Sequence, residues 1–414
     1  MEVPGIVMTL ARRVADAGGR AYVVGGWVRD HHLGLESKDA DVEVHGLPEE
    51  DLERLLRRLG RVNAVGRSFG VYKLRHKGLE LDVSLPRRDS KVGPGHKGIA
   101  VEGDPFMGIE EASRRRDLTL NAMLHDPLTG ETLDPHGGLR DLTAGVLREV
   151  DPQTFQEDPL RALRAVQFAA RFGFRLAPSL EALCRDAQLD ELPAERIRGE
   201  LEKLLLKAAQ PGSGVLLLRS LGLADKVVPE LAPTLDADMA AAVDRGAVQR
   251  DTFADAPPRL ALMLGVLLHR LPPGDAELTL DRLDVHTWQR WPVRKHTLLA
   301  LETLRATERW DDTTLRALAD TVTLRFVLRL RHALTPAAGA LQDLARAEAL
   351  GVADAPLPRV LTGGDLFGMG VEPGPQMGAL LAEVRKAQHA GGVTDQAAAM
   401  ALVRRHLRSD AESS

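Results

Sequence analysis

The stretch "GGWVRDHHLGLESKDADVEV", residues 25–44, decides how the first part of the chain folds. It begins with a glycine pair after the apolar run "AYVV" and ends with "KDADVEV", in which polar and apolar residues alternate. Such alternation predicts a β-strand, because successive side chains of a strand point to opposite faces. One face of this strand is apolar, and the other carries Asp39, Asp41 and Glu43. Carboxylates this close repel one another, so the polar face requires a cation.

A second strand with the same pattern is "LELDVSL", residues 79–85. If it lies beside the first strand, Asp82 converges with Asp39 and Asp41. Carboxylates without a cysteine or a histidine cluster favour a hard cation, Mg²⁺ before Zn²⁺. A solvated polar strand face is the alternative interpretation, and Glu80 is the alternative third ligand.

The glycine pair Gly25 and Gly26 follows an apolar strand, where it allows the backbone to approach a phosphate closely. A simple strand-to-helix turn also uses glycine. Arg29, four residues after Gly25, suits phosphate oxygens because its guanidinium is a planar fork of donors. An ion pair with Asp30 is the alternative for this arginine.

The overall composition is that of an ordinary soluble protein, with 44% hydrophobic and 27% charged residues in 414. One cysteine, Cys184, excludes a disulfide framework and favours a reducing, cytoplasmic location. We expect neither a signal peptide nor a membrane span. The net charge of −5 weakens an RNA-binding interpretation without excluding it, since phosphate contacts need only a local basic surface. The oligomeric state stays open, with a monomer favoured.

The pattern of secondary-structure signals in the sequence changes near residue 150. Before it, strands, helices and glycines alternate; from about residue 155 nearly all segments have helical periodicity. The expected fold is an α/β head, a small mixed sheet with flanking helices, followed by an extended all-α portion. The segment "RDLTLNAMLHD" (residues 116–126) reads equally well as helix or strand. We predict four parts, the head (1–150), a neck (151–212), a body (213–355) and a tail (356–414) with a disordered end.

Residues 25–44 taken together resemble the first signature of the class II tRNA nucleotidyltransferases and the related bacterial poly(A) polymerases, within the polymerase-β-like nucleotidyltransferases. Further segments resemble this family's motifs in the expected order. They are "RRRDLTLNAM" (114–123), the hinge "DPHGGLRDL" (134–142), the base-reading "EDPLRALRAVQFAARFGF" (157–174) and the structural neck element "ERIRGELEKLL" (195–205). The resemblance is close over residues 21–206 and looser beyond.

The resemblance implies a nucleotidyltransferase head that works with two metal ions. Asp39 and Asp41 would bridge both Mg²⁺ ions, and Asp82 would hold the ion that acidifies the attacking hydroxyl. Arg29 and Arg116 would contact the triphosphate or the primer phosphate. Asp117 would accept from the ribose hydroxyls, unless it is a helix N-cap. Asn121 belongs to the same nucleotide-binding motif.

The base-reading motif implies that Asp158 and Arg161 select the nucleotide without a template. A carboxylate accepts from the amino group of C or A while a guanidinium donates to the ring nitrogen, and U and G present the reverse pattern. On one helix, positions 158, 161, 164 and 171 share a face, so a plain salt bridge between Asp158 and Arg161 is the alternative. Arg164 joins the nucleotide site, and Arg164, Arg171 and Arg175 could guide the RNA by its phosphates.

The segment from Arg87 to Phe106 is glycine-rich and basic, and we expect a long loop beside the site. In the family a flexible loop here helps the pocket switch from C to A. Its presence argues against an enzyme that adds only C.

The leading hypothesis is an enzyme that adds CCA to the 3′ end of tRNA from CTP and ATP with Mg²⁺. The alternatives are a form that adds only A, a bacterial poly(A) polymerase, and a catalytically silent RNA-binding protein on the same fold.

Overall fold

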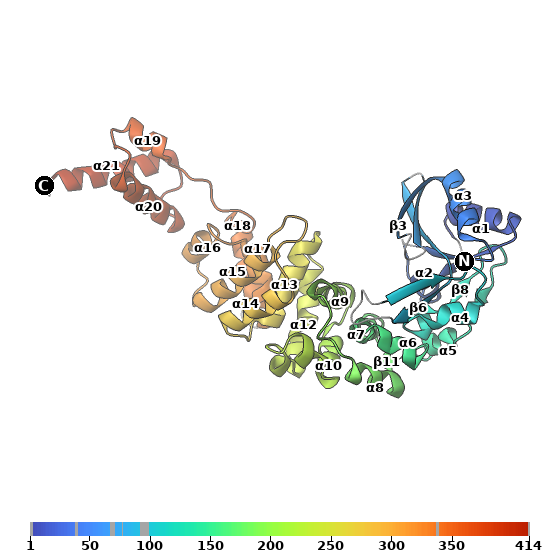
Figure 1. Ribbon diagram of the computed structural model, residues 1–414. Helices are drawn as coiled ribbons and strands as arrows, with labels where there is room; N and C mark the ends of the chain where they lie inside the picture. Colours follow the sequence, from blue (N-terminus) through green and yellow to red (C-terminus); the bar gives the residue numbers. More distant parts are fainter. Residues whose placement is uncertain are drawn as a thin grey trace. The chain divides into compact units, whose positions relative to one another are not determined.

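The computed structural model describes residues 3–37, 40–66, 71–76, 78–91, 99–336 and 339–412. The chain divides into two compact units, Met1–Leu235 and Asp236–Ser414 (Figure 1). The finer division into head, neck, body and tail stays a prediction. Asp39 lies outside the described residues, as do the last two residues of the chain.

The main sheet of the first unit has seven strands among the described residues, in the order β3-β4-β5-β2-β1-β8-β9. Strand β2 pairs with β5 in parallel, whereas its pairing with β1 is antiparallel. The predicted mixed sheet is therefore confirmed. The strands are β1 (Arg20–Val24), β2 (Asp41–His45), β3 (Arg61–Gly66), β4 (Val71–His76), β5 (Leu79–Ser84), β8 (Leu124–His125) and β9 (Thr132–Leu133).

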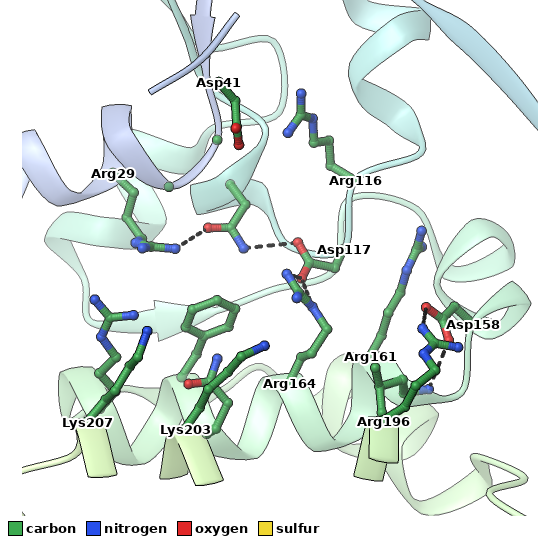
Figure 2. Close-up of a pocket in the computed structure, with 17 residues that line it drawn as sticks. Arg29, Asp41, Arg116, Asp117, Asp158, Arg161, Arg164, Arg196, Lys203 and Lys207 are labelled. Atoms are coloured by element: carbon green, nitrogen blue, oxygen red, sulfur yellow. Dashed lines mark hydrogen bonds and ion pairs between the residues drawn. The ribbon is translucent and has the colours of Figure 1, made fainter. Parts of the chain in front are cut away.

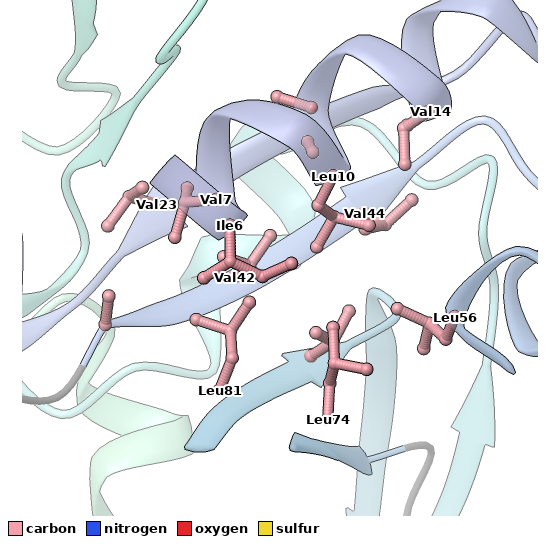
Figure 3. Packing of buried hydrophobic residues seen from close by; sticks show 14 of the residues in the cluster. Ile6, Val7, Leu10, Val14, Val23, Val42, Val44, Leu56, Leu74 and Leu81 are labelled. Atoms are coloured by element: carbon pink, nitrogen blue, oxygen red, sulfur yellow. The ribbon is translucent and has the colours of Figure 1, made fainter. Parts of the chain in front are cut away.

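Helices α1 (Gly5–Asp16) and α3 (Glu49–Leu59) pack with this sheet to form a hydrophobic core (Figure 3). Leu10 and Val14 recur at helical spacing on α1 and are fully buried. They meet the alternate residues of the strands, such as Val42 and Val44 of β2. This core occupies the apolar face of β2, which leaves Asp41 and Glu43 on the opposite face.

The segment from Arg87 to Phe106 differs from the expected long loop. Strands β6 (Arg87–Lys91) and β7 (Ile99–Gly103) pair antiparallel as a separate two-stranded sheet. Pairing supplies the backbone hydrogen bonds that a loop would have to find in solvent. Residues 92–98 lie outside the described part of the chain.

The ambiguous segment 116–126 contains both kinds of structure. A 3₁₀ turn, η3 (Thr119–Asn121), comes first and β8 follows after two residues. Helix α2 (Gly26–His32) begins directly after Gly25, and α4 (Ile109–Arg114) ends just before the paired arginines Arg115 and Arg116.

The rest of the first unit is mainly helical, and α7 packs against both α9 and α10. A short parallel pair joins β10 (Val146–Leu147), before α6, to β11 (Arg175–Leu176), after α7. The helices are α5 (Gly138–Thr143), α6 (Pro152–Glu157), α7 (Leu160–Phe172), α8 (Pro178–Asp186), α9 (Ala194–Lys207), α10 (Gly212–Ser220), α11 (Leu223–Val227) and the 3₁₀ turn η4 (Ala232–Thr234).

Among the described residues of the second unit, all the named elements are helices, as predicted. Its last three helices enclose a hydrophobic cluster of their own, centred on Leu366 and Ala399. The helices are α12 (Ala237–Arg250), α13 (Ala256–Leu268), α14 (Pro273–Arg282), α15 (Val293–Ala306), α16 (Asp312–Leu318), α17 (Leu324–Leu334), α18 (Ala340–Ala349), α19 (Gly363–Gly368), α20 (Pro375–His389) and α21 (Gln396–Glu412). Among the described residues, no helix combines the length and the apolar character that crossing a membrane requires.

Candidate active site

A cavity of about 460 Å³ in the first unit gathers most of the predicted site residues (Figure 2). Asp41 of β2 and Arg116, which follows α4, enter it from one side, and side chains of α7 and α9 enter it from the opposite side. The predicted residues that line it are Gly25, Gly26, Arg29, Asp41, Arg116, Asp117, Asn121, Asp158, Arg161 and Arg164. Asp82 is not part of the lining, and Asp39 lies outside the described residues.

Asp41 and Asp82 are direct neighbours across the parallel pairing of β2 with β5. The expected pairing of these two positions in the sheet is therefore confirmed, and the shared metal site stays a prediction. The Asp82 carboxylate accepts from Lys73 Nζ at 3.0 Å. Glu80 accepts from Arg75 at 2.7 Å and from Lys73 at 3.1 Å. These hydrogen bonds, that from Arg75 first, lower the pKa of Glu80.

The donor set at this edge suits a hard cation. Asp41 is exposed at the start of β2. The carboxylate of Asp82, its neighbour on β5, forms an ion pair with Lys73. Carboxylate oxygens are the ligands that Mg²⁺ prefers. Within the described residues no group of three acidic, histidine or cysteine side chains surrounds one point, and Asp39 is not among those residues.

Glu43 differs from the other carboxylates of the opening stretch because it is buried, with 1% of its surface exposed. Its carboxylate lies 3.1 Å from His45 Nε2, 3.0 Å from Arg115 Nη2 and 3.5 Å from Arg116 Nη2. Burial alone would raise the pKa of Glu43, but the His45 contact and the two arginines outweigh it and lower the pKa to about 2. Its charge is therefore satisfied inside the protein.

Gly25 and Gly26 bring the backbone close to two arginines. Gly25 has a φ of 70°, and a Cβ there would lie 3.1 Å from Arg116 Nη1. Arg29 is buried and forms the ion pair with Asp30 at 2.6 Å, so the alternative interpretation of this arginine holds. It also donates to Asn121 Oδ1 at 2.6 Å. Burial lowers the pKa of Arg29 despite the pairing with Asp30.

Asn121 connects Arg29 to a second ion pair on the cavity wall. Its amide nitrogen donates to Asp117 Oδ1 at 2.9 Å, and Asp117 Oδ2 lies 2.7 Å from Arg164 Nη2. Burial would raise the pKa of Asp117, but Arg164 and the Asn121 hydrogen bond lower it to about 2. The N-cap alternative for Asp117 is wrong, because Leu118 occupies that position before η3.

Asp158 is not on the helix that carries Arg161. Helix α7 begins at Leu160 with Pro159 as its N-cap, so Asp158 lies in the link from α6. Its carboxylate accepts from Leu160 N at 3.2 Å and from Arg196 Nη2 at 2.9 Å. Within the described residues no salt bridge joins it to Arg161, so that alternative is wrong.

Arg161 is held by main-chain carbonyls. It donates to Thr154 O and to Arg115 O, both at 2.6 Å. Because Asp158 and Arg161 have separate anchors, both line the cavity without neutralising each other.

Helix α9 contributes cavity residues that the sequence reasoning missed. They are Arg196, Lys203 and Lys207, on a segment expected to be only structural. Their spacing of seven and four residues places them on one helix face, which is the signal that could have identified them. From α7, Leu160, Gln167 and Phe168 also line the cavity. Arg171 lines it as well, whereas Arg175 on β11 does not.

The cavity is strongly basic although the chain is acidic overall. Among the described residues that line it, eight carry a positive charge and three, Asp41, Asp117 and Asp158, carry a negative one. A concave site with this excess of arginine and lysine attracts polyanions. A ligand with several phosphates matches the cavity best.

Comparison with known proteins adds to this geometry. Residues 21–148 match the family described as "Poly A polymerase head domain", and residues 173–235 match "Probable RNA and SrmB- binding site of polymerase A". A "Multifunctional CCA protein" of Xanthomonas campestris pv. campestris is 37% identical over 268 residues, which are 62% of this chain and 60% of that protein. One from Aromatoleum aromaticum is 38% identical over 270 residues, 62% of this chain and 63% of the relative. The chain thus spans less than two thirds of the length of these curated relatives.

Solved structures show the same fold. The CCA-adding enzyme of Bacillus stearothermophilus in complex with CTP has a TM-score of 0.79 at 24% identity, covering 100% of both chains. A tRNA nucleotidyltransferase complexed with a primer tRNA and an incoming ATP analog has a TM-score of 0.62 at 26% identity. It covers 82% of this chain and 99% of its own.

Proposed function

Because the chain belongs to the family of tRNA nucleotidyltransferases and bacterial poly(A) polymerases, we propose that it adds C and A from CTP and ATP to the 3′ end of tRNA. One observation carries this proposal. A single basic cavity is lined by Asp41 of β2 and by Asp158 and Arg161. The last two are an acceptor and a donor that suit the Watson–Crick edges of C and A.

In the proposed reaction the 3′-hydroxyl oxygen of the RNA forms a bond to the α-phosphorus of the nucleotide. The bond to pyrophosphate breaks, and the hydroxyl proton is lost to solvent. Asp41 and Asp82, with Asp39, would hold Mg²⁺ at the β2–β5 edge. When bound, two such ions stabilise the attacking and the leaving oxygens.

The protein side chains bind and orient the nucleotide. Arg116, beside Gly25, faces the phosphates, where the glycine leaves room for close approach. Asp158 accepts from the exocyclic amino group of C or A, and Arg161 donates to the ring nitrogen. Arg29, Asn121, Asp117 and Arg164 keep the cavity wall in shape through their mutual hydrogen bonds. The hydroxyl groups of the ribose would donate to Asp117.

The test is to incubate the protein and Mg²⁺ with tRNA that ends before CCA, or after CC, with each nucleotide alone and with CTP and ATP together. Three additions on the first substrate are expected when CTP and ATP are both present. Addition of A alone, or of long A tails, would replace the proposal by one of the two related activities. The variant in which both Asp39 and Asp41 are alanine is the control, and we expect it to add nothing. RNA binding without addition by the unmodified protein would point to the silent RNA-binding alternative.

A second measurement tests the base-reading pair. Asp158→Ala should reduce the preference for CTP over UTP about tenfold or more, because the amino group loses its acceptor. Unchanged selectivity would remove Asp158 and Arg161 from the proposed mechanism.

A further inference from the structure

Glu43 has a buried position that the catalytic roles proposed above do not explain. It lies two residues from Asp41 on the same face of β2, yet 1% of its surface is exposed. One carboxylate oxygen lies against His45 Nε2 and the other against the guanidinium groups of Arg115 and Arg116. The opposite nitrogen of the His45 ring, Nδ1, lies 3.2 Å from Met107 O. Glu43 is thus enclosed by positively charged and polar groups, and no part of it faces the cavity.

The two arginines held by Glu43 lead to different parts of the cavity. Arg116 lines the cavity, with Nη1 beside Gly25. Arg115 does not line it, but its carbonyl oxygen accepts from Arg161 Nη2 at 2.6 Å. Consecutive residues therefore set the phosphate-facing guanidinium and one of the two anchors of the base-facing guanidinium.

The other anchor of Arg161 belongs to the same neighbourhood. Arg161 Nη1 donates to Thr154 O, and the Thr154 hydroxyl donates to Arg114 O at 3.0 Å. Both carbonyls that hold Arg161 are thus tied to residues 114–116. A shift of this segment would move Arg161 and Arg116 together.

We infer that Glu43 is a positioning residue that fixes residues 115–116 and through them both Arg116 and Arg161. The inference rests on the proposed function and assigns the third carboxylate of "KDADVEV" to orientation of the nucleotide site. Without the negative charge, the guanidinium groups of Arg115 and Arg116 would lose the carboxylate that they share. The segment would then lose a contact that fixes its position, so phosphate binding and base selection would fail together.

The simplest alternative is that Glu43 only stabilises the head. Measurements of melting temperature and of nucleotide selectivity distinguish these two roles. A stabilising residue changes the melting temperature and the amount of active protein, which affects all four nucleotides equally. A positioning residue changes the ratio between nucleotides.

The experiment uses the full chain with Glu43→Gln, Arg115→Gln and Arg115→Lys. Binding of CTP and of UTP is measured by titration in Mg²⁺ without RNA, and KM and kcat are measured with tRNA. For Glu43→Gln we expect KM for CTP and ATP to rise about tenfold and the preference for CTP over UTP to fall about tenfold, the effect of losing one charged hydrogen bond. The kcat at saturation should change less, since Asp41 and Asp82 are untouched.

Arg115 keeps the inference testable if Glu43→Gln fails to fold. The Arg115 side chain is 19% exposed and lies outside the cavity lining, so its replacement reaches the nucleotide only through the segment. Arg115→Gln should lower the preference for CTP over UTP, and Arg115→Lys should restore it because the ammonium ion can still pair with Glu43. Asp343→Asn is the matched control, because Asp343 also holds two arginines, Arg331 at 2.5 Å and Arg346 at 2.9 Å, in the second unit.

The outcomes are distinct. If Arg115→Gln and Glu43→Gln lower the melting temperature, as Asp343→Asn does, and leave the CTP/UTP ratio unchanged, the inference is overturned. If the unmodified protein binds CTP no better than UTP, the inference is also overturned. If it binds CTP selectively but never extends tRNA, the proposed function fails, and the binding ratios of the variants still decide the role of Glu43.

Discussion

Asp158 depends on a contact from another helix. One oxygen of its carboxylate accepts from Leu160 N at 3.2 Å, and Arg196 of α9 donates to the other at 2.9 Å. Arg161, in contrast, has two main-chain anchors. Removal of the Arg196 side chain should therefore loosen Asp158, the acceptor of the base-reading pair, and leave Arg161, its donor, in place.

Arg196→Ala should lower the preference for CTP over UTP several-fold, because the Asp158 carboxylate would keep only its contact with Leu160 N and could rotate away from the amino group of the base. The measurement is the ratio of kcat/KM for the two nucleotides. Arg198→Ala is the matched control on the same helix, since Arg198 pairs with Glu202 at 3.4 Å and does not line the cavity. Equal ratios for both variants would contradict the prediction.

Which individual residues line the cavity was largely predictable, and the contacts they make were not. Spacing within "KDADVEV" and "LELDVSL" predicted that Asp41 and Asp82 share a sheet face, because strand geometry has a period of two. The register of β2 with β5 pairs the two positions, but only Asp41 lines the cavity. The same period put Glu43 beside them, and burial gave it different partners. The Arg29–Asp30 pair and the Asp117–Arg164 pair show why, since side chains compete for partners that are distant in the sequence.

At the scale of elements, the position of α7 depends on close packing against α9 and α10. Gly214 of α10 lies where a Cβ would be 2.5 Å from Leu204 Cδ1 and 2.9 Å from Ala170 Cβ. Leu204 is buried at 2% exposure, so it cannot move away freely. The glycine thus allows the three helices to approach closely behind the cavity.

Gly214→Ala should destabilise the protein by about 1 to 3 kcal/mol, the usual effect of overpacking. Gly199→Ala on α9 is the matched control, because a Cβ there meets no atom within 4 Å. That variant should gain about 0.5 to 1 kcal/mol from helix propensity. Urea unfolding of the full chain measures both, and changes of the same sign would contradict the packing argument.

Elements with a strong period were predictable, and those without one were not. The hairpin of β4 and β5 and the helices α1 and α3 follow their apolar spacing. Segment 87–106 contains too many glycines and charges for a clear period, so the pairing of β6 with β7 was missed. The start of α7 was missed because residues 158, 161, 164 and 171 share one face of an ideal helix, which suggested that the helix includes Asp158. The helix begins after Pro159.

At the scale of the whole molecule, Glu43 and Asp117 make stability depend on acid. Both have a pKa of about 2 in the folded chain, below the ordinary values of 4.5 and 3.8. A lowered pKa means that the folded state binds fewer protons than the unfolded state between those values. The stabilisation is complete above about pH 4.5 and is lost as the pH falls towards 2, by about 2 to 3 kcal/mol for each group.

Asp117→Asn should therefore reduce stability strongly at pH 6 and much less near pH 2, where Asp117 of the unmodified protein is itself becoming protonated. Thermal unfolding across this range measures the gap between the two proteins. The exposed Asp190 provides a control, and Asp190→Asn should leave stability unchanged at every pH. A gap for Asp117→Asn that stays constant with pH would contradict the role given to its ion pair.

The parallel pairing of β2 with β5 has a practical consequence for engineering this chain. Asp41 and Asp82 are paired by the backbone register of β2 with β5, although α3, β3 and β4 lie between them in the sequence. A label or an affinity tag inserted at Gly78 would leave Asp41 and Asp82 paired. Strand β5 is held in register by β2 on one side and by β4 on the other. Deleting a single residue inside β5 would instead turn Asp82 to the opposite face of the sheet.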